Sequence, residues 1–425
     1  MPSAGCSKTY PPDLFQNFEE YKLDYVLGTL FDSKSDEVHL ASVNLAIHGA
    51  RQRGGLSKSN FSVIHCDISH YPEVEKSRTE SIEEYSRFLA EKMHASVIVG
   101  LPNSVDSMVG FNQINQTQSV LISPAATFPS LSSIDGDEKT NQDPGLFWRT
   151  VSSDAVEAGV LAKKIRDHGH DKTAVIYTAD DYGYEYVDAL SDTHEGQLDV
   201  YELASSDSLF DIALEIAETS VTAIVFVSSK ASDSISFINE AAGLSAFEQK
   251  IIYLNSTAMV DGLFDTDATL HSKIWGFRPL LPSGRVFEEF VSDVGSTVDV
   301  QSPEYFSAAH TYDASWLAIY GYTWAHFQES VINGVSIARG LRRLSDPLQN
   351  KASVGLAGWS TLESNFAAGE EIDIQGASGM LDFDRSTEEL YNPIEVLRLN
   401  AVERCYKRLE ICYSSGCESF SGLCE

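Results

Sequence analysis

Several polar residues stand where predicted buried strands end, and their side chains are hydrogen-bonding groups. Ser104 follows the strand predicted over residues 96–100, and Thr127 follows the strand predicted over residues 119–123. Tyr182 stands at the entrance of a predicted helix. Hydroxyl groups and helix N-terminal amides donate to a carboxylate or carbonyl oxygen without burying a second charge. This pattern predicts a site for an anionic or carbonyl group of a small ligand.

Four further residues complete the predicted binding set. The small residues 124–127 let a ligand approach the backbone amide of Ala125. Ser228 and Asn255 end two later strands and should face the same edge of a sheet. Tyr312 lies in a long predicted helix, where packing against neighbouring side chains is the simpler interpretation.

The sequence lacks the patterns of common catalytic sites. No HExxH, GxSxG, GxGxxG or GxxxxGK[ST] motif occurs. Asp180 and Asp181 are adjacent, so their carboxylates point apart, and a solvated loop explains them better than an acid pair. We therefore expect no enzyme activity, no metal and no cofactor.

The elements that must position these residues alternate between strands and helices. A strand over residues 119–123 is followed by a helix over residues 154–168 and a strand over residues 173–178. Asp154 is predicted to cap that helix, with Glu157 completing a capping box. This order is typical of a parallel α/β sheet, whose ligands bind beyond the carboxyl ends of the strands.

Length and charge narrow the classes of protein. A chain of 425 residues is too long for one ordinary core, so two lobes are expected. No apolar run approaches the roughly 20 residues of a membrane helix. Lys and Arg number 30 against 62 Asp and Glu, a formal charge of −32. That balance argues against nucleic acid as a partner, because phosphate binding needs clustered basic residues.

Four of the six cysteines crowd the last twenty-one residues: Cys405, Cys412, Cys417 and Cys424. They predict two disulfides and an oxidising compartment, with three pairings open. A zinc site is the alternative, which no CxxC pair or tail histidine supports.

The chain resembles the type I periplasmic solute-binding proteins, whose best-known members bind branched-chain amino acids for ABC importers. The segments that carry the resemblance are SPAATFPSL, FWRTVSSDAVEAGVLA, VIYTADDYGYEYVDAL and GASGMLDFD. It implies a two-lobed α/β fold, each lobe a parallel sheet flanked by helices, with three hinge crossings and a ligand in the cleft. The expected division is a tether over residues 1–20, lobe 1 over 21–150 and 280–374, lobe 2 over 151–279 and 375–404, and a cysteine-rich tail over 405–425.

The resemblance also implies roles for single residues. In this family an alanine amide and a threonine hydroxyl, matching Ala125 and Thr127, hold the α-carboxylate of an amino acid. Ser104 matches the second serine of the family's GPxSS-like loop. Tyr182 matches the family's Tyr-Gly turn, and Tyr312 matches its YDA motif. The family's acidic residue for the amino group is missing near Asn255, which counts against an ordinary amino-acid ligand.

The resemblance implies a small-molecule ligand, an ABC permease as partner and a place in the periplasm or on the cell surface. Residues 3–7, SAGCS, are similar to a lipobox, so a lipid on Cys6 would anchor the protein to a membrane and leave Cys66 as the odd thiol. An accidental string of small residues is the alternative. The alternative function is a ligand-sensing or protein-interaction module that keeps the fold without binding an amino acid.

Overall fold

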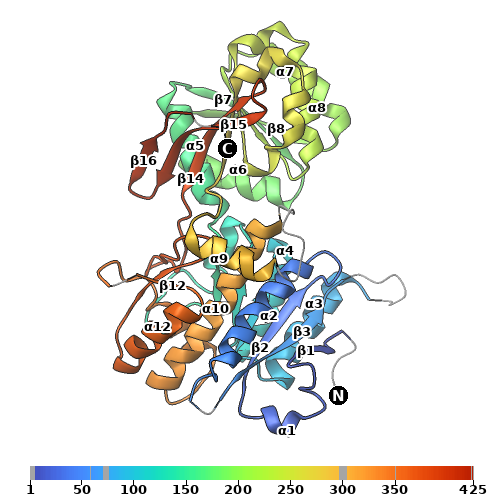
Figure 1. The fold of residues 1–425 in the computed structure, drawn as a ribbon. Helices are drawn as coiled ribbons and strands as arrows, with labels where there is room; N and C mark the ends of the chain where they lie inside the picture. Colours follow the sequence, from blue (N-terminus) through green and yellow to red (C-terminus); the bar gives the residue numbers. More distant parts are fainter. Residues whose placement is uncertain are drawn as a thin grey trace. The chain divides into compact units, whose positions relative to one another are not determined.

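The computed structural model describes residues 5–57, 59–69, 76–295, 304–349, 351–422 and 424. The chain forms two compact units (Figure 1). Unit 1 comprises residues 1–127, 131–152 and 281–390, and unit 2 comprises residues 128–130, 153–280 and 391–425.

Unit 1 is built on a six-stranded sheet in the order β1-β3-β2-β4-β5-β6. Its strands are β1 (Lys8–Tyr10), β2 (Tyr25–Phe31), β3 (Phe61–Asp67), β4 (Val97–Gly100), β5 (Val120–Ser123) and β6 (Phe147–Arg149). All neighbouring pairs are parallel except β1 with β3. The central strands are almost wholly buried, as expected for a sheet covered on both faces.

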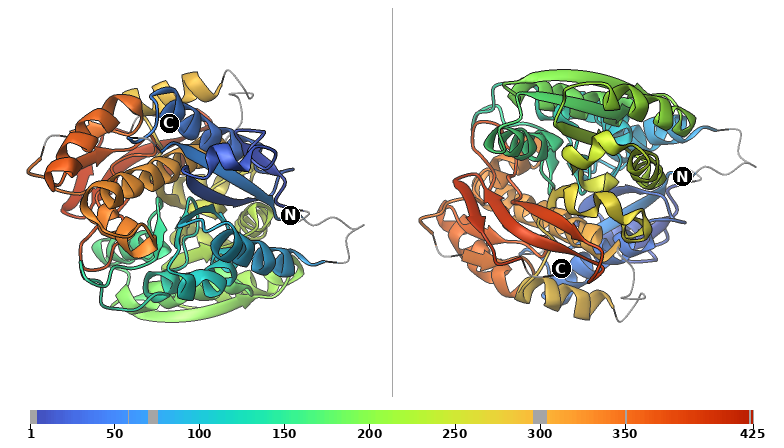
Figure 2. Two further views of the ribbon diagram at one scale, coloured as in Figure 1. Left: turned by 90° about the horizontal axis from the view of Figure 1, so that it is seen from below. Right: turned by 90° about the horizontal axis from the view of Figure 1, so that it is seen from above.

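Helices cover both faces of this sheet (Figure 2). One face forms a single core with α2 (Glu37–Gln52), α10 (Glu304–Gln328), α11 (Gly334–Leu341) and α12 (Leu356–Ala368). The other face lies under α3 (Arg78–Arg87), its π-helical extension Phe88–Lys92 and α4 (Ser104–Ile114). A Cβ on Gly28 would lie 2.8 Å from a terminal methyl group of Leu89, so a larger residue on β2 would require this side chain to shift. The smaller elements of unit 1 are α1 (Phe18–Tyr21), α9 (Arg285–Val294), β12 (Lys351–Ser353) and β13 (Asp373–Gln375).

Unit 2 is built on an eight-stranded sheet in the order β16-β15-β14-β11-β10-β9-β7-β8. Its strands are β7 (Lys172–Thr178), β8 (Gln197–Leu203), β9 (Ala223–Val227), β10 (Ile251–Leu254), β11 (Ile274–Pro279), β14 (Ile394–Asn400), β15 (Cys405–Tyr413) and β16 (Gly416–Ser419). Helices α5 (Asp154–Asp167) and α6 (Asp181–Thr193) pack on one face. Helices α7 (Leu209–Ala217) and α8 (Ala231–Ala242) pack on the other.

The third crossing lies later in the chain than the sequence predicted. Residues 375–390 belong to unit 1 rather than to lobe 2. The buried carboxylate of Asp313 on α10 explains this, because it accepts hydrogen bonds from the backbone N–H groups of Ala377 and Ser378 and from the Ser378 hydroxyl. Phe383 then packs edge-on against Trp148, with ring centroids 4.9 Å apart.

Neither end of the described chain is a separate appendage. The predicted tether contributes β1, which pairs with β3. The predicted tail forms the hairpin β15–β16, which extends the unit 2 sheet beside β14 (red strands in Figure 2). The sequence missed these strands because they are short or half exposed, and their pairing depends on strands that lie elsewhere in the chain.

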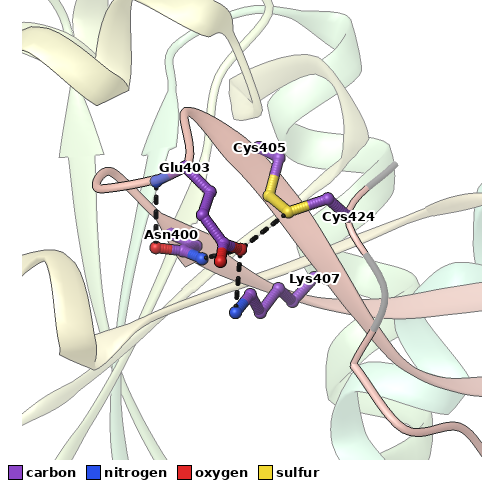
Figure 3. Close-up of a disulfide and its surroundings, with 5 residues drawn as sticks. All are labelled: Asn400, Glu403, Cys405, Lys407 and Cys424. Carbon is purple, nitrogen blue, oxygen red and sulfur yellow. Dashed lines mark hydrogen bonds and ion pairs between the residues drawn. A yellow bond between two sulfur atoms is a disulfide. The ribbon is translucent and has the colours of Figure 1, made fainter.

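The tail contains the two expected disulfides, Cys405–Cys424 and Cys412–Cys417. Figure 3 shows the first of them beside Glu403, whose carboxylate accepts from Asn400 at 2.7 Å and pairs with Lys407 at 2.9 Å. With all four sulfurs in disulfides, the zinc alternative has no thiolate ligands in this structure.

Cys6 also forms a disulfide, with Cys66 on β3. A sulfur bound to another sulfur has no thiol for a lipid, so the predicted lipidation of Cys6 and the odd thiol at Cys66 are both corrected. Residues 1–4 of the lipobox-like string lie outside the described residues. Among the described residues, no helix has the length and apolar character to span a membrane.

Candidate functional site

At the carboxyl end of β5, unit 1 presents two hydrogen-bond donors without partners. The backbone N–H of Ala125 and the hydroxyl of Thr127 make no hydrogen bond to any described residue, and both residues are partly exposed. Because both groups are partly exposed, each can donate to solvent or to an oxygen atom of a ligand. We refer to Ser104, Ala125 and Thr127 as the donor group.

Neighbouring serines hold this loop in place. The Ser104 oxygen accepts from the Thr127 N–H at 3.0 Å, so two of the predicted residues are in direct contact. The Ser123 oxygen accepts from the Ala126 N–H at 3.1 Å, and its own proton goes to the Leu101 carbonyl. The N-cap of α4 is Asn103, because its side chain accepts from the Asp106 N–H. The Ser104 side chain is therefore available to orient Thr127.

Behind the loop lies Arg149, which sequence reasoning missed. Its side chain is 1% exposed, pairs with Glu389 through two hydrogen bonds of 2.8 Å and donates to the Ala126 carbonyl at 3.1 Å. Glu389 therefore balances the charge of Arg149. The guanidinium group of Arg149 also fixes the backbone between Ala125 and Thr127. Arg149 lies in the segment FWRTVSSDAVEAGVLA that carried the family resemblance, but nothing in that resemblance gave a reason to expect this contact.

In unit 2, the structure brings Tyr182 and Asn255 together. The buried Asn255 amide donates 2.8 Å hydrogen bonds to the hydroxyl oxygens of Tyr182 and Thr257. Thr257 in turn donates to the Ser228 carbonyl. The Tyr182 hydroxyl accepts from Asn255, so its own proton can be donated to another acceptor. Thr257 was missed because a threonine in a loop carries no pattern of its own.

Next to this pair lies a buried acid, Glu157, on α5. One carboxylate oxygen accepts from the Tyr186 hydroxyl at 2.9 Å and from the Ser256 N–H at 3.0 Å. Burial, with a smaller contribution from the nearby Asp154, raises the pKa of Glu157 to about 8. The predicted capping box is wrong, because Ser153 is the N-cap and Glu157 points into the unit instead. A glutamate on the apolar stripe of the predicted helix was the signal that could have identified it. We refer to Glu157, Tyr182, Tyr186 and Asn255 as the acid group.

The other two predicted residues have local contacts. Ser228 is fully buried, and its hydroxyl lies within hydrogen-bonding distance of Lys230 and Asp233 in the following turn. Tyr312 packs against Phe290 and Trp316, with ring centroids 5.0 and 6.2 Å away. Direct ligand contacts by either residue stay predictions.

Comparison with known proteins identifies the family. The model of the receptor family ligand binding region matches residues 39–400, which is most of the chain. The chain belongs to this family. No curated protein matches the sequence.

Solved structures share the fold across nearly their whole length. A branched-chain amino acid transporter substrate-binding protein, LivJ, from Streptococcus pneumoniae in complex with isoleucine is 16% identical, with a TM-score of 0.60 over 92% of this chain and 99% of that one. An ABC transporter substrate-binding protein from Desulfitobacterium hafniense in complex with leucine is 17% identical, with a TM-score of 0.62 over 91% and 100%. A solute-binding protein from R. palustris in complex with benzoate is 12% identical, with a TM-score of 0.59 over 94% and 99%. The fold is that of the two-lobed type I periplasmic binding proteins.

Proposed function

We propose that this chain is an extracytoplasmic solute-binding protein that captures a small polar solute for an ABC importer. The observation that carries the proposal is the pair of unpartnered donors, the Ala125 amide and the Thr127 hydroxyl, at the carboxyl end of β5. A carboxylate or carbonyl oxygen accepts from both without a buried Lys or Arg. The carboxylates of isoleucine, leucine and benzoate in the similar structures support this class of solute.

The acid group of unit 2 supports a polar solute rather than a purely apolar one. We assign the contact with the solute to Tyr182, which is partly exposed, and treat Asn255 as the residue that positions it. Glu157 is 2% exposed and already holds Tyr186 and the loop at Ser256. Because burial raises the pKa of Glu157 to about 8, this side chain is largely neutral near pH 7, and its role is to hold Tyr186 and the loop that follows Asn255 in place.

The disulfides support an extracytoplasmic location. All six cysteines are paired in the structure. Disulfides persist in oxidising compartments such as the periplasm and the cell surface, and are rare in the cytosol. An ABC permease is the partner that this role requires.

A thermal-shift screen tests the proposal, because a solute that binds only the folded state raises its stability. The screen contains leucine, isoleucine, benzoate, short amides and small aliphatic carboxylates. Calorimetry then compares the wild type with Thr127→Ala for the solute that gives the largest shift. We expect the variant to lose about 1–3 kcal/mol of binding free energy, which corresponds to a roughly 5- to 150-fold rise in Kd.

Thr79→Ala is the matched control, since Thr79 is an exposed threonine of unit 1 on α3. It should bind as the wild type does. Equal affinity of Thr127→Ala and wild type would place the site elsewhere, and a screen without any stabilising solute would favour an interaction module.

A further inference from the structure

The sequence contains three Asn-x-Ser/Thr triplets without proline at the middle position. They are Asn60-Phe61-Ser62, Asn115-Gln116-Thr117 and Asn255-Ser256-Thr257. This triplet is the acceptor of N-linked glycosylation in proteins that leave the cytoplasm. A triplet alone does not identify a modified residue, because the asparagine amide must also be free and have room for a bulky sugar in the folded protein.

The hydrogen bonds of Asn255 exclude it as the modified residue. Its side chain is fully buried, and its amide nitrogen donates 2.8 Å hydrogen bonds to the hydroxyl oxygens of Tyr182 and Thr257. Its amide oxygen accepts from the Ser228 N–H. Because both amide protons are used, a sugar on this nitrogen would displace Tyr182 or Thr257.

Asn60 is a poor acceptor because the turn around it is tight. It is half-buried before the amino end of β3, and its amide oxygen accepts from the Phe61 N–H at 3.0 Å. Its backbone N–H donates to the Asp24 carboxylate, and its carbonyl accepts from the Tyr25 N–H. Its Cα lies 2.8 Å from the position that a Cβ on Gly55 would occupy. A sugar would have little room beside this turn.

Asn115 differs from both of these residues. It is exposed in the short 3₁₀ helix Asn115–Thr117 that follows α4, and no residue of this helix is buried. Its side-chain amide has no hydrogen-bond partner among the described residues. The Thr117 hydroxyl donates to the Ile114 carbonyl at 2.6 Å, which fixes the turn. The Asn115 amide is therefore both free and accessible.

The place of Asn115 in the fold leaves the donor group open. Asn115 precedes the amino end of β5, whereas Ala125 and Thr127 follow its carboxyl end, and a strand of four residues spans about 13 Å. Ser104 begins α4, and Asn115 follows the end of this helix of 11 residues, which is about 16 Å long. A sugar on Asn115 therefore begins at the opposite end of the sheet from the donor group.

We propose that Asn115 is a site of N-linked glycosylation. The Asn115 side-chain nitrogen forms a bond to the anomeric carbon of the first sugar of a lipid-pyrophosphate-linked oligosaccharide. The bond between that carbon and the pyrophosphate oxygen breaks, the lipid pyrophosphate leaves with the electron pair, and a base of the transferase takes the amide proton. The three disulfides support passage through an oxidising compartment. This inference rests on the extracytoplasmic location in the proposed function and not on the solute.

The test is to secrete the full chain from a eukaryotic host cell and to purify the folded protein. Peptide-N-glycosidase in heavy-oxygen water converts each glycosylated asparagine to a labelled aspartate, which peptide mass spectrometry locates. We expect the label at Asn115, and none at Asn60 or Asn255. A label at either of these residues instead of Asn115, or no label at all, would overturn the proposal.

Variants separate the triplet from its surroundings. Asn115→Gln and Thr117→Ala should each abolish the label, whereas Thr117→Ser keeps the triplet and should retain it. Asn112→Gln is the matched control, because Asn112 is an exposed asparagine of α4 outside any triplet. If Asn115→Gln still carries a glycan of the same mass, the site lies elsewhere.

The experiment also separates this inference from the proposed function. Secretion brings the chain to the transferase whatever its native location, so an unmodified Asn115 in the secreted protein would overturn the inference and leave the proposed function standing. The solute screen, in turn, can fail while Asn115 carries a glycan. Asn115→Gln should bind the solute found in the screen with the wild-type Kd.

Discussion

The candidate groups of the two units differ in how fully their hydrogen bonds are used. In unit 1, the Ala125 amide and the Thr127 hydroxyl have no partner among the described residues. In unit 2, Asn255 donates a hydrogen bond to Tyr182. Glu157 accepts hydrogen bonds from Tyr186 and from the Ser256 N–H, which directly follows Asn255 in the chain. Unit 1 thus presents two partly exposed donors, whereas the polar groups of unit 2 form a hydrogen-bond network around a buried acid.

Burial of an acidic side chain does not by itself indicate that the side chain binds a ligand. Asp313 of unit 1 is also fully buried, and burial raises its pKa to about 7, yet its three hydrogen bonds hold the turn at residues 377–378. Glu157 differs because its neighbours include the partly exposed Tyr182. The predictions below test this contrast.

The largest expected effect is the pH dependence contributed by Glu157. Its pKa is about 8 in the folded protein and near 4.5 when unfolded, so between these values the unfolded chain loses a proton that the folded chain keeps. Stability should therefore fall as pH rises from about 4.5 to about 8, by about 5 kcal/mol at most. Glu157→Gln keeps an acceptor for Tyr186 and Ser256 but cannot ionise.

Urea unfolding at a series of pH values measures this effect. The variant should match the wild type near pH 4 and be the more stable protein above pH 8. A wild type and variant whose stabilities differ by the same amount at every pH would show that Glu157 titrates normally. The comparison isolates Glu157, because the titration of Asp313 is present in both proteins.

The disulfides of the two units should contribute unequally. Cys6–Cys66 spans 60 residues, whereas Cys412–Cys417 spans only 5. By the loop-entropy model, the double variant Cys6→Ser/Cys66→Ser should lose about 4 kcal/mol and Cys412→Ser/Cys417→Ser about 2.

Denaturant unfolding of both double variants gives the comparison. Intact mass after alkylation without reductant is the accompanying control, and it should detect no free thiol in the wild type. Alkylation of Cys6 or Cys66 in the native protein would contradict the disulfide between them. Cys6 would then have a free thiol to which a lipid could be attached.

Asp313→Asn tests the structural role assigned to the buried acid of unit 1. The amide presents N–H groups to the donors of Ala377 and Ser378, so we expect a loss of about 2 kcal/mol of unfolding free energy. Glu370→Gln, an exposed acid of the same unit, is the control and should change stability little. If Asp313→Asn is as stable as the wild type, the turn is held by other contacts.

Tyr182→Phe should give the smallest effect. It removes the hydroxyl that Asn255 orients, and should raise the Kd of the solute found in the screen by about three- to tenfold, or about 1 kcal/mol. Tyr184→Phe is the matched control, because Tyr184 is an exposed tyrosine of the same helix turn whose hydroxyl donates to Glu202. Equal Kd values for the two variants would remove Tyr182 from the site.

Much of the architecture could be predicted from local pattern. The strands that end at Ser123 and Thr178 were each predicted to within one residue of the bounds that the structure shows. Such strands are continuous apolar runs between turn residues, and that signal depends only on neighbours in the chain. The short edge strands β1 and β16 were missed, because their stability comes from the strands they pair with.

The sequence by itself determined the fold class, the placement of Ser104, Ala125 and Thr127 at strand ends, and the presence of disulfides in the tail. Residue types, periodicity and a family resemblance suffice for these, since each concerns a short segment. Only the tertiary structure decided that Cys6 pairs with Cys66, that Arg149 supports the loop at Ala126, and that Glu157 faces Tyr186 and Ser256. These partners are separated by 23 to 99 residues, and whether they meet depends on how helices and strands pack, which no local pattern contains.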